Sequence, residues 1–234
     1  MKVAVIIQNN NYTRVFPFID SRIDSIVEVG SRDALDAIEL SKHFNAEVST
    51  FEPDPESYAI CMNNLSISGH LPIKLYSDAL SDTNGVLPFN VYSTGNSSLF
   101  KHKTAPVRST INIKVSRFDS LGVPAPDLLV MDAQSCEYQI LKGFGQSLSK
   151  TKYIVFETGF YSIYDSNENF DSCNKYLKLL GYKFLATNVS GKGLLRFYIM
   201  RARGIIFYMR KFGFKGFSEY SGFFDVLFVR DSPR

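Results

Sequence analysis

The fold is decided by the stretch Ile26-Val-Glu-Val-Gly-Ser-Arg-Asp33, where an apolar run ends at a glycine. Ile26–Val29 predicts a buried strand, and residues from Ala34 to about Phe44 predict the helix after it. Gly30 can adopt dihedrals closed to other residues, so the chain can turn sharply there and pass close under a ligand. The pattern predicts the first strand, turn and helix of an α/β sheet, with a ligand at the carboxyl end of the strand.

The same alternation continues along the chain. Further strands are predicted at Ala46–Phe51, about Ile73–Leu80, Asp127–Met131, Tyr153–Phe156, Tyr182–Thr187 and Phe224–Val229. Core-facing helical stripes are predicted for Tyr58, Cys61, Met62 and Leu65, for Ile140, Leu141 and Phe144, and for Cys173, Tyr176, Leu177 and Leu180. Strands that alternate with helices in this way form a mostly parallel sheet with helices on both faces.

Two stretches interrupt the alternation within a single predicted domain, residues 24–234, which follows an N-terminal extension, residues 1–23. Residues 83–117 are rich in turn signals between short alternating runs, which predicts a β-hairpin or flap. Residues 190–222 form a basic, aromatic region, in which Lys192 to Ser218 contains no acidic residue. We expect both stretches to shape an acceptor pocket.

Composition is that of an ordinary globular protein, with 45% hydrophobic and 21% charged residues among 234. The net charge of +3 does not by itself imply a polyanionic partner. The three cysteines, Cys61, Cys136 and Cys173, have no zinc-site spacing and are expected to be free thiols. The sequence lacks a secretory apolar segment and an apolar run of about 18 residues, so a cytoplasmic location without a membrane span is expected.

The turn after the first strand predicts the class of ligand. A dinucleotide site needs several glycines because a pyrophosphate must approach the helix N-terminus, whereas Gly30 is followed by Ser31, Arg32 and Asp33. Asp33 would repel a phosphate, and Glu28 adds a second acid. An acid-lined turn suits a methionyl group that carries a sulfonium, as in S-adenosylmethionine.

The next two strands add polar groups at the same edge. Glu52 and Pro53 end the second strand, where a carboxylate can accept both ribose hydroxyls of an adenosine. Asp78 and Ala79 end the third strand, where a short side chain and the backbone can meet the adenine edge. The ordered set favours an adenosine cofactor more strongly than any one of these residues does.

The chain resembles the FkbM family of methyltransferases over about residues 24 to 230. The resemblance lies in Val27-Glu-Val-Gly-Ser-Arg-Asp33, Phe51-Glu-Pro-Asp-Pro55, Ala79-Leu-Ser-Asp-Thr-Asn-Gly85, Asn96-Ser-Ser-Leu99, Phe118-Asp-Ser-Leu121, the segment from Asp127 to Gly143 and Phe224-Asp-Val-Leu-Phe-Val-Arg230. It implies a Rossmann-like class I methyltransferase fold with a seven-stranded sheet, S-adenosylmethionine as methyl donor, and usually O-methylation of a sugar or other small natural product. By position, Glu28, Gly30 and Glu52 would line the cofactor, and Asp132 would face the transferred methyl.

The sequence departs from the family pattern at two places. Ala34 stands where many members have glycine, and Ser135-Cys136 replaces a glycine-containing step between Asp132 and Glu137. Neither change removes a charged group that the chemistry needs.

Methyl transfer to an alcohol needs alignment of donor and acceptor and a base for the hydroxyl proton. Asp132 is the first candidate, Glu157 at the end of its strand the second, and His102 in the excursion the third. A divalent metal held by Asp132 and Glu157 is conceivable, but two carboxylates do not define a site, so no metal is predicted.

The methyl acceptor is the least determined part. A hydroxyl of a sugar, glycan or other small natural product is the first expectation. Nucleic-acid methylation, RNA in particular, is an alternative because the basic aromatic region could stack bases or bind phosphates. A degenerate protein that binds S-adenosylmethionine without transferring methyl groups is a second alternative, and a nicotinamide-dependent dehydrogenase is disfavoured by the missing glycines. Oligomeric state is not predicted.

Overall fold

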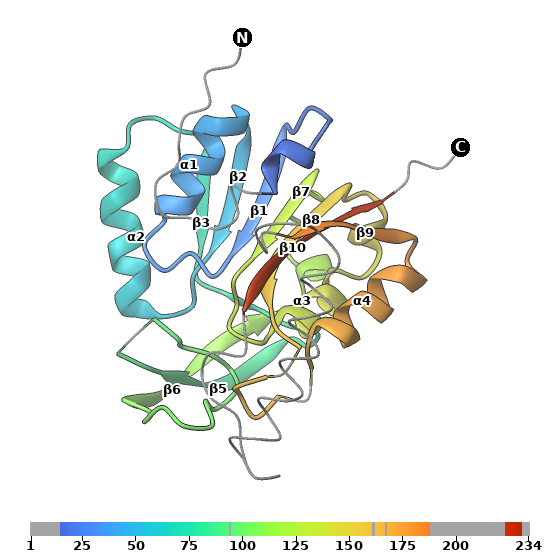
Figure 1. Cartoon of the computed structure of the whole chain (residues 1–234). Helices are drawn as coiled ribbons and strands as arrows, with labels where there is room; N and C mark the ends of the chain where they lie inside the picture. The colour runs from blue at the N-terminus through green and yellow to red at the C-terminus, as the bar shows by residue number, and fades with distance from the viewer. Residues whose placement is uncertain (1–14, 94, 161, 167, 188–222, 231–234) are drawn as a thin grey trace.

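A seven-stranded sheet forms the centre of the molecule (Figure 1). The computed structural model describes residues 15–93, 95–160, 162–166, 168–187 and 223–230. The sheet order is β3-β2-β1-β7-β8-β10-β9, and β10 is antiparallel to both of its neighbours. Its strands are β1 (Ser25–Val29), β2 (Glu47–Phe51), β3 (Ile73–Tyr76), β7 (Leu128–Met131), β8 (Tyr153–Thr158), β9 (Tyr182–Thr187) and β10 (Phe224–Arg230). This confirms the predicted α/β class and the mostly parallel seven-stranded sheet.

Helices cover both faces of this sheet (Figure 1). They are α1 (Leu35–Phe44), α2 (Pro55–Ile67), α3 (Glu137–Phe144) and α4 (Phe170–Leu179), with short 3-10 turns η2 (Phe16–Phe18), η3 (Phe118–Ser120) and η4 (Gly145–Ser149). Because side chains alternate along a strand, Val27 and Val29 pack with the apolar stripes of α3 and α4. Ile26 points to the other face, where it packs with Leu40 of α1 and with Phe16.

The N-terminal segment is part of this second core. Val15 is fully buried and Phe16 is 8% exposed, and the Phe16 ring packs edge-on against Phe44 of α1. Residues 15–23, assigned in the sequence to an extension, therefore pack against the domain. The predicted basic aromatic region, residues 190–222, lies outside the described residues. Among the helices that the structure describes, none is long and apolar enough to cross a membrane.

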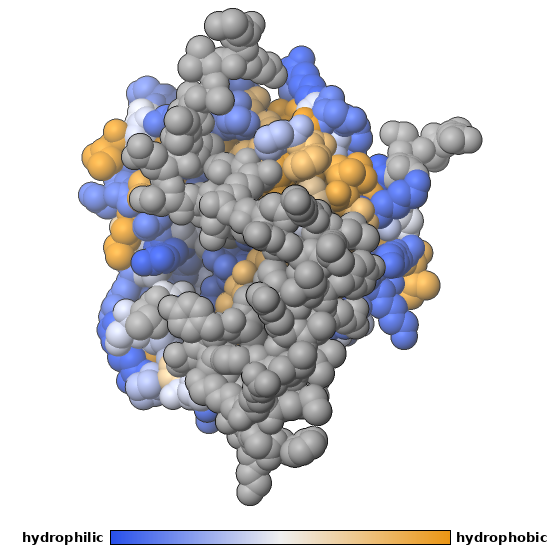
Figure 2. Space-filling model, viewed as in Figure 1, coloured by the Kyte–Doolittle hydropathy of each residue, from blue (hydrophilic) through white to orange (hydrophobic). Residues whose placement is uncertain are grey.

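The expected helix is present as α2, but its core stripe is only partly confirmed, since Tyr58 and Leu65 are half-buried. Cys61 is buried, but Met62 is 55% exposed, and the neighbouring Ile60 and Ile67 are 50% and 76% exposed. The reason is position: α2 packs beside α1 and edge strand β3, so only a narrow part of its surface is covered. Figure 2 shows apolar surface along the left edge of the molecule, where Figure 1 places α2.

The predicted third strand divides into two. β3 ends at Tyr76, and β4 (Ala79–Leu80) leaves the main sheet to pair in parallel with β6 (Ser109–Ser116). β6 also pairs antiparallel with β5 (Gly85–Val91), which gives a second sheet of order β4-β6-β5. Figure 1 shows β5 and β6 below the main sheet, at the end where β1 and β7 terminate. The turn-rich excursion of the sequence is this second sheet and its connections.

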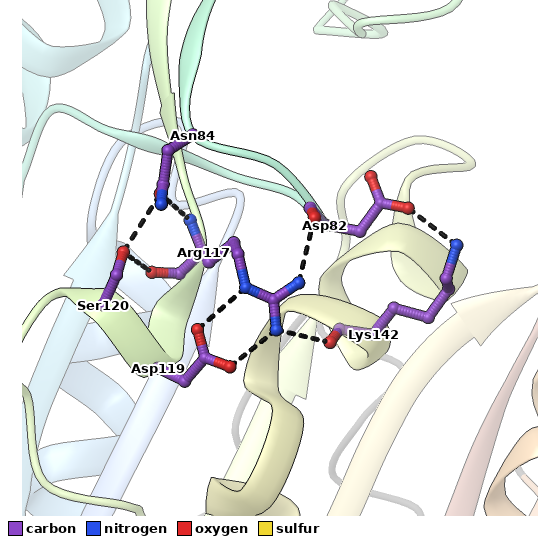
Figure 3. Close-up of polar contacts among 6 residues, drawn as sticks. All are labelled: Asp82, Asn84, Arg117, Asp119, Ser120 and Lys142. Atoms are coloured by element: carbon purple, nitrogen blue, oxygen red, sulfur yellow. Dashed lines mark hydrogen bonds and ion pairs between the residues drawn. The ribbon is translucent and has the colours of Figure 1, made fainter.

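A polar clamp joins the second sheet to α3 (Figure 3). The Arg117 guanidinium donates to the backbone carbonyls of Asp82 and Lys142, and Lys142 Nζ lies 2.7 Å from the Asp82 carboxylate. A Cβ added to Gly143 would lie 1.9 Å from the carbonyl oxygen of Ser81. Only a glycine lets the α3 backbone approach the chain directly after β4 so closely, and this explains the Leu-Lys-Gly step in the sequence.

Candidate active site

The turn after β1 lies at the carboxyl edge of the sheet. Gly30 has φ +91°, and its backbone N–H donates to the Phe51 carbonyl at the end of β2. A Cβ built on Gly30 would lie 2.0 Å from the backbone oxygen of Asp132, at the end of β7. The turns after β1 and β7 therefore touch through their backbones, and glycine is required by this contact as well as by its φ value.

Glu52 holds the turn after β1 in place. Its side chain accepts hydrogen bonds from the backbone N–H of Arg32, at 2.7 Å, and of Asp54, at 2.8 Å. The residue is 6% exposed, and burial raises the pKa of its carboxyl to about 7. Each carboxylate oxygen has a second lone pair, so Glu52 can still accept hydrogen bonds from a ligand.

A cleft with an empty volume of about 650 Å³, open to solvent, lies between this turn, the turn after β7 and the second sheet. Seven of the predicted residues line it: Gly30, Arg32, Glu52, Pro53, Asp78, Ala79 and Asp132. The same cleft is also lined by residues that the sequence did not assign to the cofactor site. They are Phe51, Asp54, Ser57, Leu80, Phe89, Gly95, Ser97, Leu99, Ala133, Gln134, Cys136 and Ile140. The Asn-Ser-Ser-Leu and Met-Asp-Ala-Gln motifs contain several of these residues and were the available signal.

Three predicted cofactor residues do not line the cleft. Glu28 is 3% exposed and accepts a hydrogen bond from the Thr50 hydroxyl of β2, and burial raises the pKa of its carboxyl to about 8. Ser31 is 3% exposed. The Asp33 carboxylate accepts from the N–H of Leu35 and so supports the start of α1. Glu28 lies inside β1 and faces Thr50 of the neighbouring strand, whereas Ser31 and Asp33 belong to the turn itself but do not line the cleft.

Asp78 joins the cleft to the second sheet. Its Oδ1 accepts from the Ser116 hydroxyl at 2.6 Å and lies 2.8 Å from Lys114 Nζ. Both partners belong to β6, so the second sheet holds the Asp78 carboxylate in place at the first cleft. Phe89 of β5 adds an apolar ring to the same wall of the cleft.

A second cleft, of about 410 Å³, lies beside the first and shares Gln134 with it. It is lined by Gln134, Ser135, Glu137, Tyr138, Glu157, Thr158, Gly159, Ser162, Glu168, Asn169, Cys173 and Phe223. Asp132 lies next to the junction, because its Oδ1 accepts a hydrogen bond of 2.6 Å from Gln134 Nε2. Of the three predicted bases, Asp132 lines the first cleft and Glu157 the second.

The carboxyls of the second cleft differ from ordinary surface acids. Burial, and then the negative charge of Asp132, raise the pKa of Glu157 to about 8. Burial also raises the pKa of Glu137 to about 8, although its Oε1 accepts a hydrogen bond of 2.9 Å from the Ala133 N–H. Both groups can therefore carry a proton near neutral pH.

His102 lines neither cleft. It is 9% exposed, and its Nδ1 accepts hydrogen bonds from the backbone N–H of Thr104, at 3.1 Å, and of Ala105, at 2.8 Å. The ring packs edge-on against Tyr164. These contacts tie His102 into its own loop, so it acts here as a packed turn residue.

The donors and acceptors of the first cleft fit S-adenosylmethionine. Four acids, Glu52, Asp54, Asp78 and Asp132, line it together with Arg32. This set suits ribose hydroxyls and a cationic sulfonium and is unfavourable for a pyrophosphate. Across the described part of the chain, no group of three His, Cys, Asp or Glu side chains is arranged to hold a metal ion.

Residues 28–184 match the family model of the methyltransferase FkbM domain. The chain belongs to the FkbM methyltransferase family. Membership confirms the predicted family, a family of methyltransferases. In this FkbM-family chain both sequence departures fall on left-handed backbone, with φ +62° at Ala34 and +73° at Ser135. A glycine in either place would relieve the strain of the left-handed backbone.

One similar curated protein is 2-O-methyltransferase NoeI from Sinorhizobium fredii, 26% identical over 161 residues. The match covers 60% of this FkbM-family chain and 65% of the relative, so the chain spans about two thirds of that protein.

Solved structures agree on the fold. A methyltransferase FkbM from Methylobacillus flagellatus superposes with a TM-score of 0.50 at 15% identity, over 69% of this chain and 39% of that one. A ribosomal protein L11 methylase from Lactobacillus delbrueckii gives a TM-score of 0.53 at 9% identity, over 95% of this chain and 77% of that one. At these identities the likeness concerns the fold of the FkbM-family chain alone.

Proposed function

We propose that this protein transfers the methyl group of S-adenosylmethionine to a hydroxyl of a sugar, a glycan or another small natural product. The observation that carries the proposal is the position of Asp132, a carboxylate that lines the cofactor cleft and is hydrogen-bonded to Gln134, which borders both clefts. A base at such a junction can take the proton of an alcohol held in the second cleft. The printed activity of the relative NoeI, 2-O-methylation, supports an oxygen acceptor.

The first cleft supplies a residue for each part of the cofactor. Glu52 would accept the ribose hydroxyls, Asp78 and Ala79 would lie at the adenine, and Arg32 would pair with the methionyl carboxylate. When bound, S-adenosylmethionine supplies a methyl group on a sulfonium, which is already a good leaving group. The protein then has to align the acceptor, exclude water and accept one proton at the Asp132 carboxylate.

The second cleft favours a neutral acceptor rich in hydroxyls. Its polar lining includes the amide of Asn169, the hydroxyls of Thr158 and Ser162, and the carboxyls of Glu137 and Glu157. Its described lining contains no Lys or Arg. Such a surface can exchange hydrogen bonds with a sugar, whereas it offers no cation to a phosphate backbone, and this ranks RNA below a glycan.

The decisive test has two parts. Calorimetry with S-adenosylmethionine, S-adenosylhomocysteine and NAD should give binding of the first two only. Release of S-adenosylhomocysteine is then measured with a panel of glycans, small hydroxylated natural products and RNA. We expect methylation of a glycan or small-molecule hydroxyl, lowered at least about a hundredfold in Asp132→Asn, in line with loss of a general base.

The outcomes separate the alternatives. Methylation of RNA alone would replace the acceptor, and cofactor binding without turnover on any acceptor would favour a degenerate binding protein. NAD binding in place of S-adenosylmethionine would overturn the proposal. We also propose a cytoplasmic location, where the three free cysteines, all buried, would stay reduced.

A further inference from the structure

The turn between β7 and α3 has an unusual backbone. Gln134 and Ser135 are consecutive non-glycine residues with φ +52° and +73°. Left-handed backbone costs such residues of order 1 kcal/mol or more each, and it persists only where surrounding contacts enforce it. Strain of this kind next to Asp132 calls for a physical reason.

Two other parts of the chain hold this turn by side-chain hydrogen bonds. From the second sheet's connection, the Ser98 hydroxyl donates to the Gln134 carbonyl at 2.8 Å. From the loop after β8, the Ser162 hydroxyl lies 3.1 Å from that of Ser135. Ser98 is 1% exposed, so the contact with Gln134 is made away from solvent. The strained conformation is therefore enforced from two sides.

The result is a directed chain of hydrogen bonds. The hydroxyl of Tyr164, a fully buried residue, lies 2.7 Å from Gln134 Oε1 and 3.0 Å from the carbonyl of Asn96. The phenol has a single proton, and donating it to Oε1 holds the Gln134 amide with its oxygen toward Tyr164. An ionised Asp132 requires the same orientation, because a reversed amide would place Oε1 against a carboxylate oxygen. The opposite end, Nε2, then donates to Asp132 Oδ1 at 2.6 Å.

We propose that Gln134 and Tyr164 are positioning residues that orient Asp132 and keep it ionised beside the junction of the two clefts. Burial raises the pKa of the Tyr164 phenol above its usual value, so it remains a donor throughout the working pH range. The amide can only donate through Nε2, and a donor to a carboxylate favours the charged form. The charged form is the one that can accept a proton from an alcohol, so the link to catalysis rests on the proposed function.

Two further carboxyls lie close enough to Asp132 to oppose its negative charge. Glu137 and Glu157 both interact electrostatically with Asp132, and ionising either one would oppose its negative charge. Gln134 is neutral, so it supplies a donor without the counter-charge that a lysine would bring.

The test measures Asp132 directly in the ligand-free full chain. Protein labelled with ¹³C at aspartate carboxyls is titrated by NMR, and the Asp132 signal is assigned from its absence in Asp132→Asn. Gln134→Met should raise the Asp132 titration midpoint by about one pH unit, a tenfold change in ionisation. Tyr164→Phe, which keeps the ring and removes only the hydroxyl, should raise it in the same direction by a smaller amount.

Tyr182→Phe is the matched control. The Tyr182 hydroxyl is also buried and lies 2.7 Å from two backbone carbonyls, those of Leu148 and Thr151, but the residue lines neither cleft. It should lower thermal stability about as much as Tyr164→Phe and leave the Asp132 midpoint unchanged. An unchanged midpoint in Tyr164→Phe and Gln134→Met, or an equal shift in Tyr182→Phe, would overturn the proposal.

A second measurement concerns catalysis. With an acceptor from the panel above, the acid limb of the kcat profile should move to higher pH in Tyr164→Phe, while KM for S-adenosylmethionine stays within about twofold. If no acceptor is methylated, the proposed function fails, yet the NMR titration still decides whether Gln134 and Tyr164 control Asp132. If the Asp132 titration midpoint shifts but the acid limb of the kcat profile does not, the effect of Gln134 and Tyr164 on Asp132 stands and only its link to catalysis is rejected.

Discussion

The turns after β1 and β7 leave neighbouring parallel strands and touch each other, yet they are built differently. Each is held by a carboxylate that accepts a backbone N–H, Glu52 for the first and Glu137 for the second. The first needs a glycine at the contact, whereas the second places Gln134 in left-handed backbone and is held by side chains from distant segments. The first turn is held by backbone contacts and by a carboxylate of the neighbouring strand, whereas the second also depends on side chains from distant segments.

The largest loss of stability should come from a side chain placed where the backbones of the two turns touch. In Gly30→Ala the new Cβ would lie 2.0 Å from the Asp132 backbone oxygen, at a φ of +91°. We expect a loss of about 3 kcal/mol or more in the free energy of unfolding, measured by chemical denaturation, because backbone must move.

Gly69→Ala provides the control. Gly69 has the same φ of +91°, but an added Cβ would meet nothing within 4 Å. Gly69→Ala should lower the free energy of unfolding by only about 1 kcal/mol, the cost of an alanine in left-handed backbone. Equal losses in the two variants would show that the contact between the turns contributes nothing.

The second largest effect should be a loss of cofactor affinity when the Glu52 carboxylate is removed. Glu52→Ala deletes the acceptor for the Arg32 and Asp54 N–H groups and for the ribose hydroxyls, so calorimetry should show S-adenosylmethionine affinity reduced by about a hundredfold. Glu56→Ala, a nearby exposed carboxylate paired with Arg108, should leave the affinity within about twofold. Unchanged affinity in Glu52→Ala would reject the cofactor assignment while leaving the family intact.

Glu137, the carboxyl that holds the turn after β7, should make the stability of the protein depend on pH. The folded-state pKa of Glu137 is about 8, above its ordinary value of 4.5, so the folded state binds the proton more tightly and its stability falls as pH rises between these values. Glu137→Gln should remove this part of the fall, about 1 kcal/mol per pH unit between pH 5.5 and 7.5. Urea denaturation at several pH values measures it, and exposed Glu47→Gln should follow the wild-type slope.

The smallest loss of stability should come from breaking the polar clamp between the second sheet and α3. Lys142→Met breaks the pair with Asp82, in which both side chains are partly exposed, at 43% and 31%. Such pairs contribute about 0.5 kcal/mol, and the loss should shrink in 1 M salt. A loss as large as that of Gly30→Ala would mean that the clamp, more than the glycine contact, sets the position of α3.

The sequence was sufficient for the parts of the site that local chemistry determines. Gly30 and Glu52 end successive strands, and parallel strands bring their carboxyl ends to one edge, so their meeting could be predicted without coordinates. Asp132 was found for the same reason. The helix stripe of α2 was only partly confirmed because periodicity records an apolar face but does not reveal whether another element covers it.

By itself the sequence determined the α/β alternation, the order of the acids along the chain and the absence of a dinucleotide turn, because each depends on neighbours within a few residues. Only the tertiary structure decided that Glu28 lies under the turn, that His102 is tied into its own loop and that Tyr164 reaches Asp132 through Gln134. Thr50, which bonds Glu28, is 22 residues away in the sequence, and Gln134 is 30 residues from Tyr164, so no local pattern encodes these contacts. The bonds that tie His102 into its loop are local, but the packing of its ring on Tyr164 is not.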